Sequence, residues 1–271
     1  PALLAGNTIV FKPSEQTPKT GAFLMDLYAE AGFPAGTVNL VQGARATGEA
    51  LLAHDDLAGV LFVGSAPTGA AIHKQFGGRP DILLALEMGG NNPLIAWDVS
   101  NAKAAASHII QSAFITTGQR CTCARRIILP TGKAGNDMVD AILAAAEKIK
   151  VGAWDDEGVF MGPLVSSDIA GKVAQMAKAL PGKTLKAMTR TERGGAYLTP
   201  GIVDVTGQSV ADEEIFAPNM QIIRADDFDA AIGIANDTKF GLSAGLISDD
   251  ADLWNIFKTR IHAGVVNFNR P

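Results

Sequence analysis

Short apolar runs alternate along the chain with longer segments in which apolar residues recur at every third or fourth position. The runs predict β-strands, and the periodic segments predict α-helices. In the first part of the chain, strands are expected at residues 8–12, 38–41, 60–63 and 83–87, and helices at 17–31, 47–53 and 68–76. Further on, helices are expected at 102–116, 137–149, 169–180, 228–236 and 251–261, and strands at 126–129, 220–224, 244–247 and 265–268.

This alternation predicts an α/β fold, in which parallel sheets are covered by helices. The clearest helix pattern is that of residues 137–149, whose apolar positions form one face. Gly89 and Gly90 follow a predicted strand, and two glycines allow the backbone to change direction there. We therefore expect two α/β domains, residues 1–88 and residues 89–271.

The composition is that of a globular protein with a hydrophobic core. Hydrophobic residues make up 47% of the 271 positions and charged residues 19%, which excludes the disordered and fibrous classes. The net charge is −5 and the basic residues are scattered, so no nucleic-acid partner is expected. No apolar run reaches the roughly 18 residues of a membrane span, so no membrane partner is expected either.

Cys121 and Cys123 are too close in sequence to form a stapling disulfide. This cysteine usage predicts a reducing compartment and a cytoplasmic location. The four histidines are dispersed and no second cysteine pair exists, so no metal site is expected. The chain starts at Pro1, and its final predicted strand is cut off at Pro271, so both ends are expected to be edges of a longer protein.

Cys121 is the candidate nucleophile. It lies between a predicted helix and a predicted strand, three residues after Gly118, in a turn that can present a side chain to a cleft. The neighbouring cation of Arg120 favours a thiolate, which is the reactive form of cysteine. The alternative is a buried, inert cysteine, which is the commoner environment of this residue type.

Glu87 is the candidate proton acceptor. It ends an apolar strand and precedes two glycines. Burial at such a position brings a carboxyl group toward the range that suits proton transfer. The alternative is an exposed glutamate at a strand end, without a function.

Gly64 and Ser65 form a turn between a predicted strand and a predicted helix. The backbone N–H groups and the positive helix end at such a turn suit a phosphate. The pattern is not the GxGxxG fingerprint, and a structural turn with a serine cap accounts for it nearly as well. Lys12, Ser14 and Glu15 follow the first predicted strand and allow the same choice, between ligand contacts and a solvated loop.

Taken in order, the motifs of this chain resemble the aldehyde dehydrogenase superfamily. They are PALLAGNTIVFKPSEQTP, FVGSAPTG, LEMGG, GQRC, EEIFAP and NDTKFGLSAG, and together they extend over the whole chain. The stretches AGFPAGTVNLVQG, LEMGGNNPLI and TTGQRCTCARR are similar to the branch that oxidises succinylglutamate semialdehyde in the bacterial arginine succinyltransferase pathway. The resemblance implies the C-terminal part of a Rossmann-type cofactor domain in residues 1–88, followed by an α/β catalytic domain, truncated at its C-terminal end, in residues 89–271.

The resemblance also implies roles for individual residues. Cys121 in GQRC matches the catalytic thiol, and Glu87 in LEMGG matches the base that activates the hydrolytic water. Cys123 has no implied role and is expected to be structural. The implied cofactor-binding residues are Lys12, Ser14 and Glu15 near the adenosine ribose, Gly64 and Ser65 at the pyrophosphate, and Glu214 and Phe216 near the nicotinamide ribose and ring.

The implied activity is NAD-dependent oxidation of an aldehyde to a carboxylic acid, through a thiohemiacetal and a thioester on Cys121. Glu87 favours hydrolysis of the thioester over its transfer to coenzyme A. Glu15 favours NAD over NADP, because a carboxylate repels a 2′-phosphate. The full-length protein is expected to be active and homo-oligomeric, and the 271-residue chain alone is expected to be inactive.

The expected substrate is a small anionic aldehyde, because a succinylated semialdehyde carries carboxylates that need cationic partners. Arg120, next to Cys121, is the candidate partner, with Arg125 and Arg126 as the other choices. The alternative is that Arg120 only tunes the thiol or packs locally.

Three other functions remain open at this point. The first is another non-acylating aldehyde dehydrogenase, acting on aliphatic or amino aldehydes. The second is a cysteine hydrolase or acyltransferase without a nicotinamide cofactor, which would need a histidine partner that is not near Cys121 in sequence. The third is a non-catalytic protein that kept the fold, against which the presence of both Cys121 and Glu87 argues.

Overall fold

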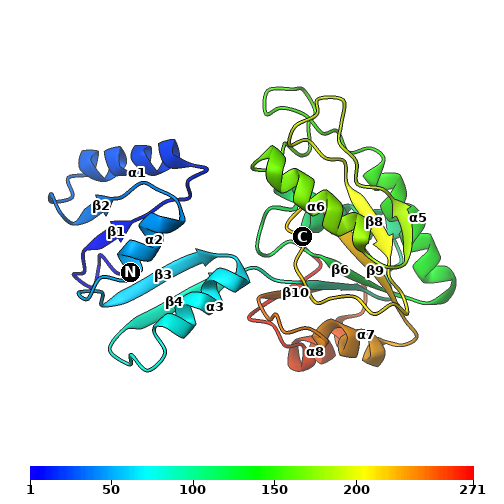
Figure 1. Ribbon diagram of the computed structural model, residues 1–271. Helices are drawn as coiled ribbons and strands as arrows, with labels where there is room; N and C mark the ends of the chain where they lie inside the picture. Colours follow the sequence, from blue (N-terminus) through cyan, green and yellow to red (C-terminus); the bar gives the residue numbers. More distant parts are fainter. The chain divides into compact units, whose positions relative to one another are not determined.

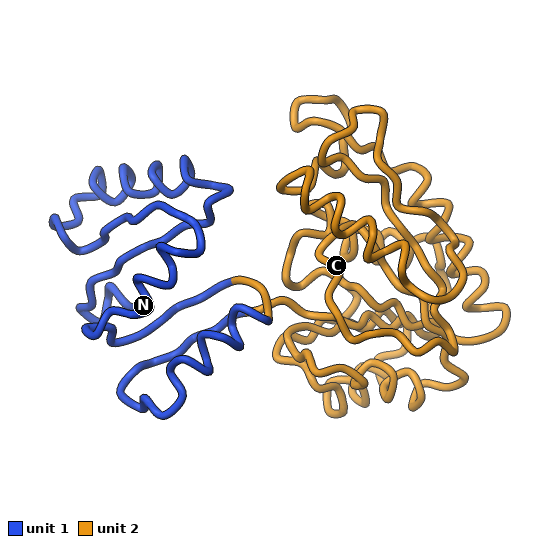
Figure 2. Tube along the Cα trace, viewed as in Figure 1, with its two compact units in different colours: residues 1–63, 67–87 blue, residues 64–66, 88–271 orange.

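The computed structural model describes all 271 residues. Contacts along the backbone divide the chain into two compact units, drawn in blue and orange in Figure 2. Unit 1 comprises residues 1–63 and 67–87, and unit 2 comprises residues 64–66 and 88–271. The assignment of the first domain to cofactor binding and of the second to catalysis stays a prediction.

Strands and helices alternate strictly in the first part of the chain. The elements are β1 (Ile9–Phe11), α1 (Pro18–Glu30), β2 (Val38–Leu40), α2 (Arg45–Leu52), β3 (Gly59–Gly64), α3 (Ala66–Gln75) and β4 (Leu83–Met88). β1 and β2 pair in parallel, with Ile9 opposite Val38 and Phe11 opposite Leu40. β3 and β4 form a second two-stranded sheet. The predicted elements of this part are all confirmed, and their ends differ from the predicted ones by at most two residues.

The sheet of β3 and β4 has one covered face and one bare face. The covered face packs against α3 around the buried residues Val60, Ile72, Phe76 and Ile82. Successive strand residues point to opposite faces. Leu61 and Val63 therefore point away from this core, and their side chains are 67% and 81% exposed.

Unit 2 is built on one seven-stranded sheet in the order β11-β10-β5-β6-β9-β8-β7. Its strands are β5 (Pro93–Ala96), β6 (Arg126–Pro130), β7 (Lys183–Lys186), β8 (Gly201–Asp204), β9 (Asn219–Ala225), β10 (Ser243–Ile247) and β11 (Val265–Phe268). The helices are α4 (Ala102–Phe114), α5 (Gly132–Ala146), α6 (Ser167–Ala179), α7 (Phe228–Asn236) and α8 (Ala251–Arg260), and a 3-10 turn, η1 (Ile115–Gly118), follows α4.

Helices cover both faces of this sheet, which is why its central strands carry unbroken apolar runs. On β6, Ile127 and Leu129 pack with α4 and α5 in one buried cluster. Ile128, between them, points to the other face and packs with α7 and α8 in a second cluster. Figure 1 shows α7 and α8 together on that side of the strands.

The structure corrects three expectations for this part of the chain. The sheet is mixed rather than parallel throughout, because β7 pairs antiparallel with β8 at the sheet edge. β5, β7 and β8 were not predicted from the sequence pattern. α5 begins at Gly132 and ends at Ala146, whereas the pattern predicts residues 137–149. None of the helices has the length and apolar character needed to cross a membrane.

Candidate active site

Cys121 lies in the connection between α4 and β6, on a turn with an unusual backbone. Thr116, Thr117 and Gly118 have φ angles of 55°, 59° and 68°. This left-handed region suits glycine but is unfavourable for β-branched residues such as threonine. Contacts elsewhere in unit 2 must therefore hold the turn.

Three side-chain contacts fix the turn to the segment that precedes α6. The Thr117 hydroxyl donates to the Gly162 carbonyl at 3.0 Å. The Gln119 amide donates to the Pro163 carbonyl at 3.2 Å and accepts from the Val165 N–H at 2.9 Å. These contacts place the residues before Cys121 in one conformation and offset the backbone strain.

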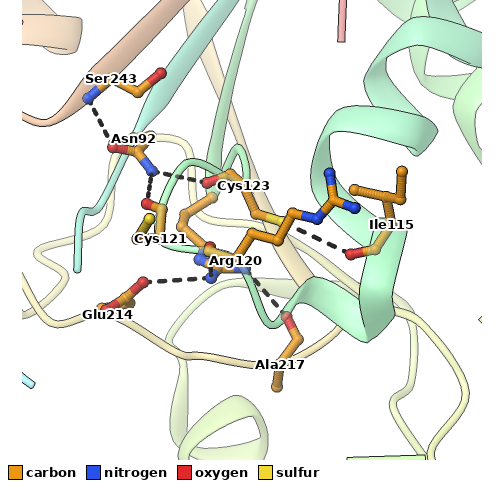
Figure 3. Close-up of polar contacts among 9 residues, drawn as sticks. Asn92, Ile115, Arg120, Cys121, Cys123, Glu214, Ala217 and Ser243 are labelled. Atoms are coloured by element: carbon orange, nitrogen blue, oxygen red, sulfur yellow. Dashed lines mark hydrogen bonds and ion pairs between the residues drawn. The ribbon is translucent and has the colours of Figure 1, made fainter. Parts of the chain in front are cut away.

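Asn92 holds the backbone of Cys121 itself (Figure 3). The buried Asn92 amide donates to the carbonyls of Cys121 at 2.7 Å and of Cys123 at 2.9 Å. Its oxygen accepts from the Ser243 N–H on β10 at 3.2 Å. One side chain thus ties the cysteine loop to the sheet, while the Cys121 residue remains exposed and free of any disulfide.

The two cysteines differ in environment. Cys123 is buried, and its thiol contacts the Ile115 carbonyl at 3.8 Å. Burial raises the pKa of Cys123, which disfavours the reactive thiolate. Cys121 is the exposed thiol of the pair, so it is the more accessible of the two, and its role as nucleophile stays a prediction.

Glu214 reaches the same region from the segment between β8 and β9 (Figure 3). Its carboxylate lies 3.3 Å from the guanidinium of the buried Arg125 and accepts from the Gly90 N–H. Burial raises the pKa of Glu214, and Arg125 opposes this rise. A Cβ atom at Gly89 would lie 1.8 Å from the Glu214 carboxylate, so a side chain at this position would displace that carboxylate.

Phe216 lies two residues further on in the same segment. Its ring is 38% exposed, unusually open for a phenylalanine. The Arg125 guanidinium lies over one face of the ring, 5.3 Å from its centre. A carboxylate and an aromatic ring are therefore held by a single arginine.

Of the three arginines considered for substrate binding, only Arg120 is exposed. Its Nε donates to the Thr116 hydroxyl at 2.9 Å, which leaves the terminal guanidinium nitrogens without an interaction inside the loop. Arg126 is buried and donates to the backbone carbonyls of Asn91, Ile234, Ala235 and Asp237. Arg126 therefore caps the end of α7, and this removes it as a substrate ligand.

Lys12, Ser14 and Glu15 follow β1, at the carboxyl end of the parallel pair β1–β2. The Lys12 ammonium donates to the carbonyls of Pro13 at 2.7 Å and of Gly43, in the loop after β2, at 2.8 Å. Ser14 accepts from a backbone N–H within its own turn, and Glu15 is exposed. In open α/β sheets, ligands bind at this end of the strands.

Gly64 ends β3, and Ser65 lies between that strand and α3. Glu87 is exposed on β4, one residue before the strand ends. Glu87 and the adenosine-site candidates such as Lys12 belong to unit 1, whereas Cys121 and Glu214 belong to unit 2. The association of Glu87 with Cys121 therefore stays a prediction from the sequence.

Asn92 was not predicted as a site residue, and Arg125 was predicted only as a possible substrate ligand. The available signal for Asn92 was its place in NNP, directly after the two glycines of LEMGG and before an apolar run. For Arg125 the signal was a charged residue entering the apolar strand β6, where an arginine must have specific partners.

Comparison with known proteins identifies the family of the chain. The model of the aldehyde dehydrogenase family matches residues 1–271. The N-succinylglutamate 5-semialdehyde dehydrogenase of Caulobacter sp. strain K31 is 52% identical over 273 residues, which cover 100% of this chain and 56% of that protein. The enzyme of the same name from Chromobacterium violaceum is 51% identical and is covered to 57%. The chain thus spans a little more than half the length of these relatives.

Solved structures agree with the fold. A γ-glutamyl-γ-aminobutyraldehyde dehydrogenase from Burkholderia cenocepacia J2315 has a TM-score of 0.92 and 32% identity, covering 99% of this chain and 56% of its own. A 1-pyrroline-5-carboxylate dehydrogenase from Thermus with bound NAD has a TM-score of 0.91 and 31% identity, covering 98% of this chain and 53% of its own. The resemblance that the motifs predicted is confirmed, and the chain belongs to the aldehyde dehydrogenase family.

Proposed function

We propose that the complete protein oxidises an aldehyde to a carboxylic acid with NAD, through a covalent intermediate on Cys121. The observation that carries this proposal is the exposed Cys121, whose backbone is held by Asn92, beside a loop whose Glu214 and Phe216 contact Arg125. A fixed, exposed thiol next to a hydrogen-bonding carboxylate and an open aromatic ring suits covalent chemistry beside a ribose and a planar ring.

The chain's residues fit the parts of a dinucleotide. Glu214 can accept from ribose hydroxyls, and the Phe216 ring can support the nicotinamide. Gly64 and Ser65, between β3 and α3, suit a pyrophosphate at a helix start. Lys12, Ser14 and Glu15 suit the adenosine ribose. When bound, NAD supplies the hydride acceptor.

Each protein group then has one task. The Cys121 thiolate attacks the carbonyl carbon, and its own backbone N–H helps to stabilise the resulting oxyanion. Loss of hydride from that carbon leaves a thioester on Cys121. Glu87 takes a proton from water, the water oxygen attacks the thioester, and the carbon–sulfur bond breaks. The carboxylic acid leaves and the thiolate is restored.

For the substrate, we propose N-succinylglutamate 5-semialdehyde, because relatives about half identical to this chain carry that name. Its carboxylates need cationic partners, and Arg120 is the exposed arginine next to Cys121. We further propose a cytoplasmic homo-oligomer as the form of the complete protein.

The test is NAD-dependent oxidation of succinylglutamate semialdehyde by the complete protein, followed by NADH absorbance. Cys121→Ala should abolish turnover, and the matched control Cys123→Ala should retain it, because that thiol is buried and is not proposed to react. Turnover of neutral aldehydes only, still dependent on Cys121, would contradict the substrate and keep the chemistry. Esterase turnover without NAD would favour a cysteine hydrolase instead.

A further inference from the structure

We propose that Arg125 is a positioning residue that holds Glu214 as a carboxylate and Phe216 in orientation, and connects both to the loop of Cys121. The inference rests on the proposed function, because Glu214 and Phe216 are assigned there to the nicotinamide ribose and ring. Arg125 itself is 2% exposed, so it acts on ligands through these two residues.

The Arg125 guanidinium spans two loops. Its Nη2 donates to the Arg120 carbonyl at 3.1 Å, one residue before Cys121, and to the Glu214 carboxylate at 3.3 Å. Its Nη1 lies 3.4 Å from the Ala217 carbonyl, and its plane lies over the Phe216 ring. Loss of Arg125 would therefore release both loops together.

The charges of Arg125 and Glu214 depend on each other. A buried guanidinium needs a partner, because an isolated charge in the protein interior is costly. Glu214 is the carboxylate that pairs with it. In the other direction, burial raises the pKa of Glu214, and Arg125 is the charged group that opposes this. The Gly90 N–H gives the remaining stabilisation of the carboxylate.

Removal of Arg125 should therefore raise the pKa of Glu214 further. A protonated Glu214 loses acceptor capacity, so it would bind ribose hydroxyls less well. The affinity for NAD would then fall at a higher pH than in the wild type as the solution is acidified.

Comparison with Arg126 separates positioning from a structural role. Arg126 is buried as well, but its hydrogen bonds go to backbone carbonyls at the end of α7 and after β4. It contacts neither Glu214 nor Phe216. Arg125 differs because its contacts are two candidate cofactor residues and the loop of the candidate nucleophile.

The experiment measures the NAD dissociation constant of the complete protein by calorimetry across the acid and neutral range. Arg125→Gln should weaken binding about tenfold at neutral pH, as expected for one lost charge-assisted contact. It should also move the acid limit of binding to higher pH. Arg125→Lys should show a smaller shift than Arg125→Gln, because lysine keeps the positive charge but not the planar contacts.

Arg193→Gln is the matched control. Arg193 also pairs with a carboxylate, Asp156, and lies over an aromatic ring, Tyr197. It is half exposed and outside the two loops, so NAD binding and its pH dependence should not change.

An unchanged pH dependence in Arg125→Gln, with a wild type that binds NAD, would overturn the role of Arg125 and leave the proposed function intact. A wild type that does not bind NAD would overturn the proposed function instead. If Arg125→Gln fails to fold, Arg125→Lys is compared alone and in a Glu214→Gln background. The proposal requires that Arg125→Lys shift the pH dependence of NAD binding when Glu214 is present and have no such effect in the Glu214→Gln background. A shift that persists in the Glu214→Gln background would contradict the proposal.

Discussion

Glu87 is an exposed carboxylate on β4, and the proposed mechanism needs it only after hydride transfer, when water must lose a proton. Glu87→Gln in the complete protein should therefore give one NADH per active site in a rapid phase. Steady-state turnover should then fall about 100-fold or more. Stopped-flow absorbance measures both phases.

The control for this change is Glu192→Gln, which alters an exposed carboxylate of unit 2 in the same way and should leave both phases unchanged. Steady-state turnover of Glu87→Gln equal to that of the wild type would refute the role of this residue.

Asn92 supports the backbone of Cys121 through its amide N–H donors, which one isosteric change removes. Asn92→Asp keeps the acceptor for Ser243 but loses the donor and places a carboxylate against the Cys121 and Cys123 carbonyls. Unfolding free energy, from urea titration, should fall by about 2–3 kcal/mol. Turnover at temperatures where the variant is folded should fall as well.

Asn269→Asp provides the comparison, because Asn269 makes the same kind of donor and acceptor pair with Ser248. It should lose stability without losing turnover. If both variants kept full turnover when folded, Asn92 would be a structural residue only.

Some candidate site residues can be predicted from a local sequence signal, and their roles stay predictions. Cys121 and Glu214 are recognisable from short motifs that contain them. Asn92 and Arg125 have partners that lie far away in sequence, Ser243 at 151 residues and Glu214 at 89 residues. A sequence pattern does not show such pairs, because the fold alone brings them together.

Among the elements, the missed strands share a physical cause. β5 has four buried residues, begins with proline and follows two asparagines, so it shows neither alternation nor length. β7, with the sequence KTLK, is a polar strand at the sheet edge. The sequence pattern misses the start of α5, because Gly132 and Gly135 lie in its first turn and glycine is a poor helix former.

Two features of Gly118 favour glycine in the turn before Cys121, its positive φ angle and its close approach to Ala217. Comparison with Gly132, which has only the positive φ angle, separates the two effects. Gly118→Ala would place a Cβ atom 2.2 Å from the Ala217 carbonyl, at a φ of 68°. Gly132 has a φ of 76° but open space around it. Thermal unfolding should show a loss of about 1 kcal/mol for Gly132→Ala and about 3 kcal/mol or more for Gly118→Ala. Equal losses would mean that the close approach to Ala217 has no energetic weight.

Asp212 ties the loop of Glu214 to two other segments. Its carboxylate accepts from the Asn91 amide at 2.9 Å, the Thr238 hydroxyl at 2.8 Å and the Lys239 N–H at 2.8 Å. Burial raises the pKa of Asp212, but these hydrogen bonds outweigh it, and the net pKa lies below the ordinary value of 3.8. Asp212 therefore stabilises the fold above pH 3.8, and this contribution is lost as the pH falls through the lowered pKa.

Asp212→Ala should accordingly cost about 1–3 kcal/mol of unfolding free energy at neutral pH, because three donors lose their acceptor. The difference from the wild type should shrink in acid. Urea titrations at a series of pH values measure it, and a difference independent of pH would contradict the role of the ionised carboxylate.

At the scale of the whole molecule, the regular alternation of elements predicted the α/β class but not the unequal cores of the two units. The buried cluster around β3 and β4 has four members, and both sheets of unit 1 have only two strands. Two-stranded sheets are marginal without further packing. Unit 2 has seven strands and three buried clusters.

The difference predicts how the two units behave when they are separated. A fragment of residues 88–271 should be monomeric or a defined oligomer, with near-ultraviolet circular dichroism and one cooperative urea transition, because its sheet is covered on both faces. A fragment of residues 1–87 should unfold without a cooperative transition, because Leu61 and Val63 leave one face of its sheet bare. Cooperative unfolding of the smaller fragment alone would show that its small core suffices. Loss of fixed tertiary structure in the larger fragment would show that unit 2 depends on unit 1 for its fold.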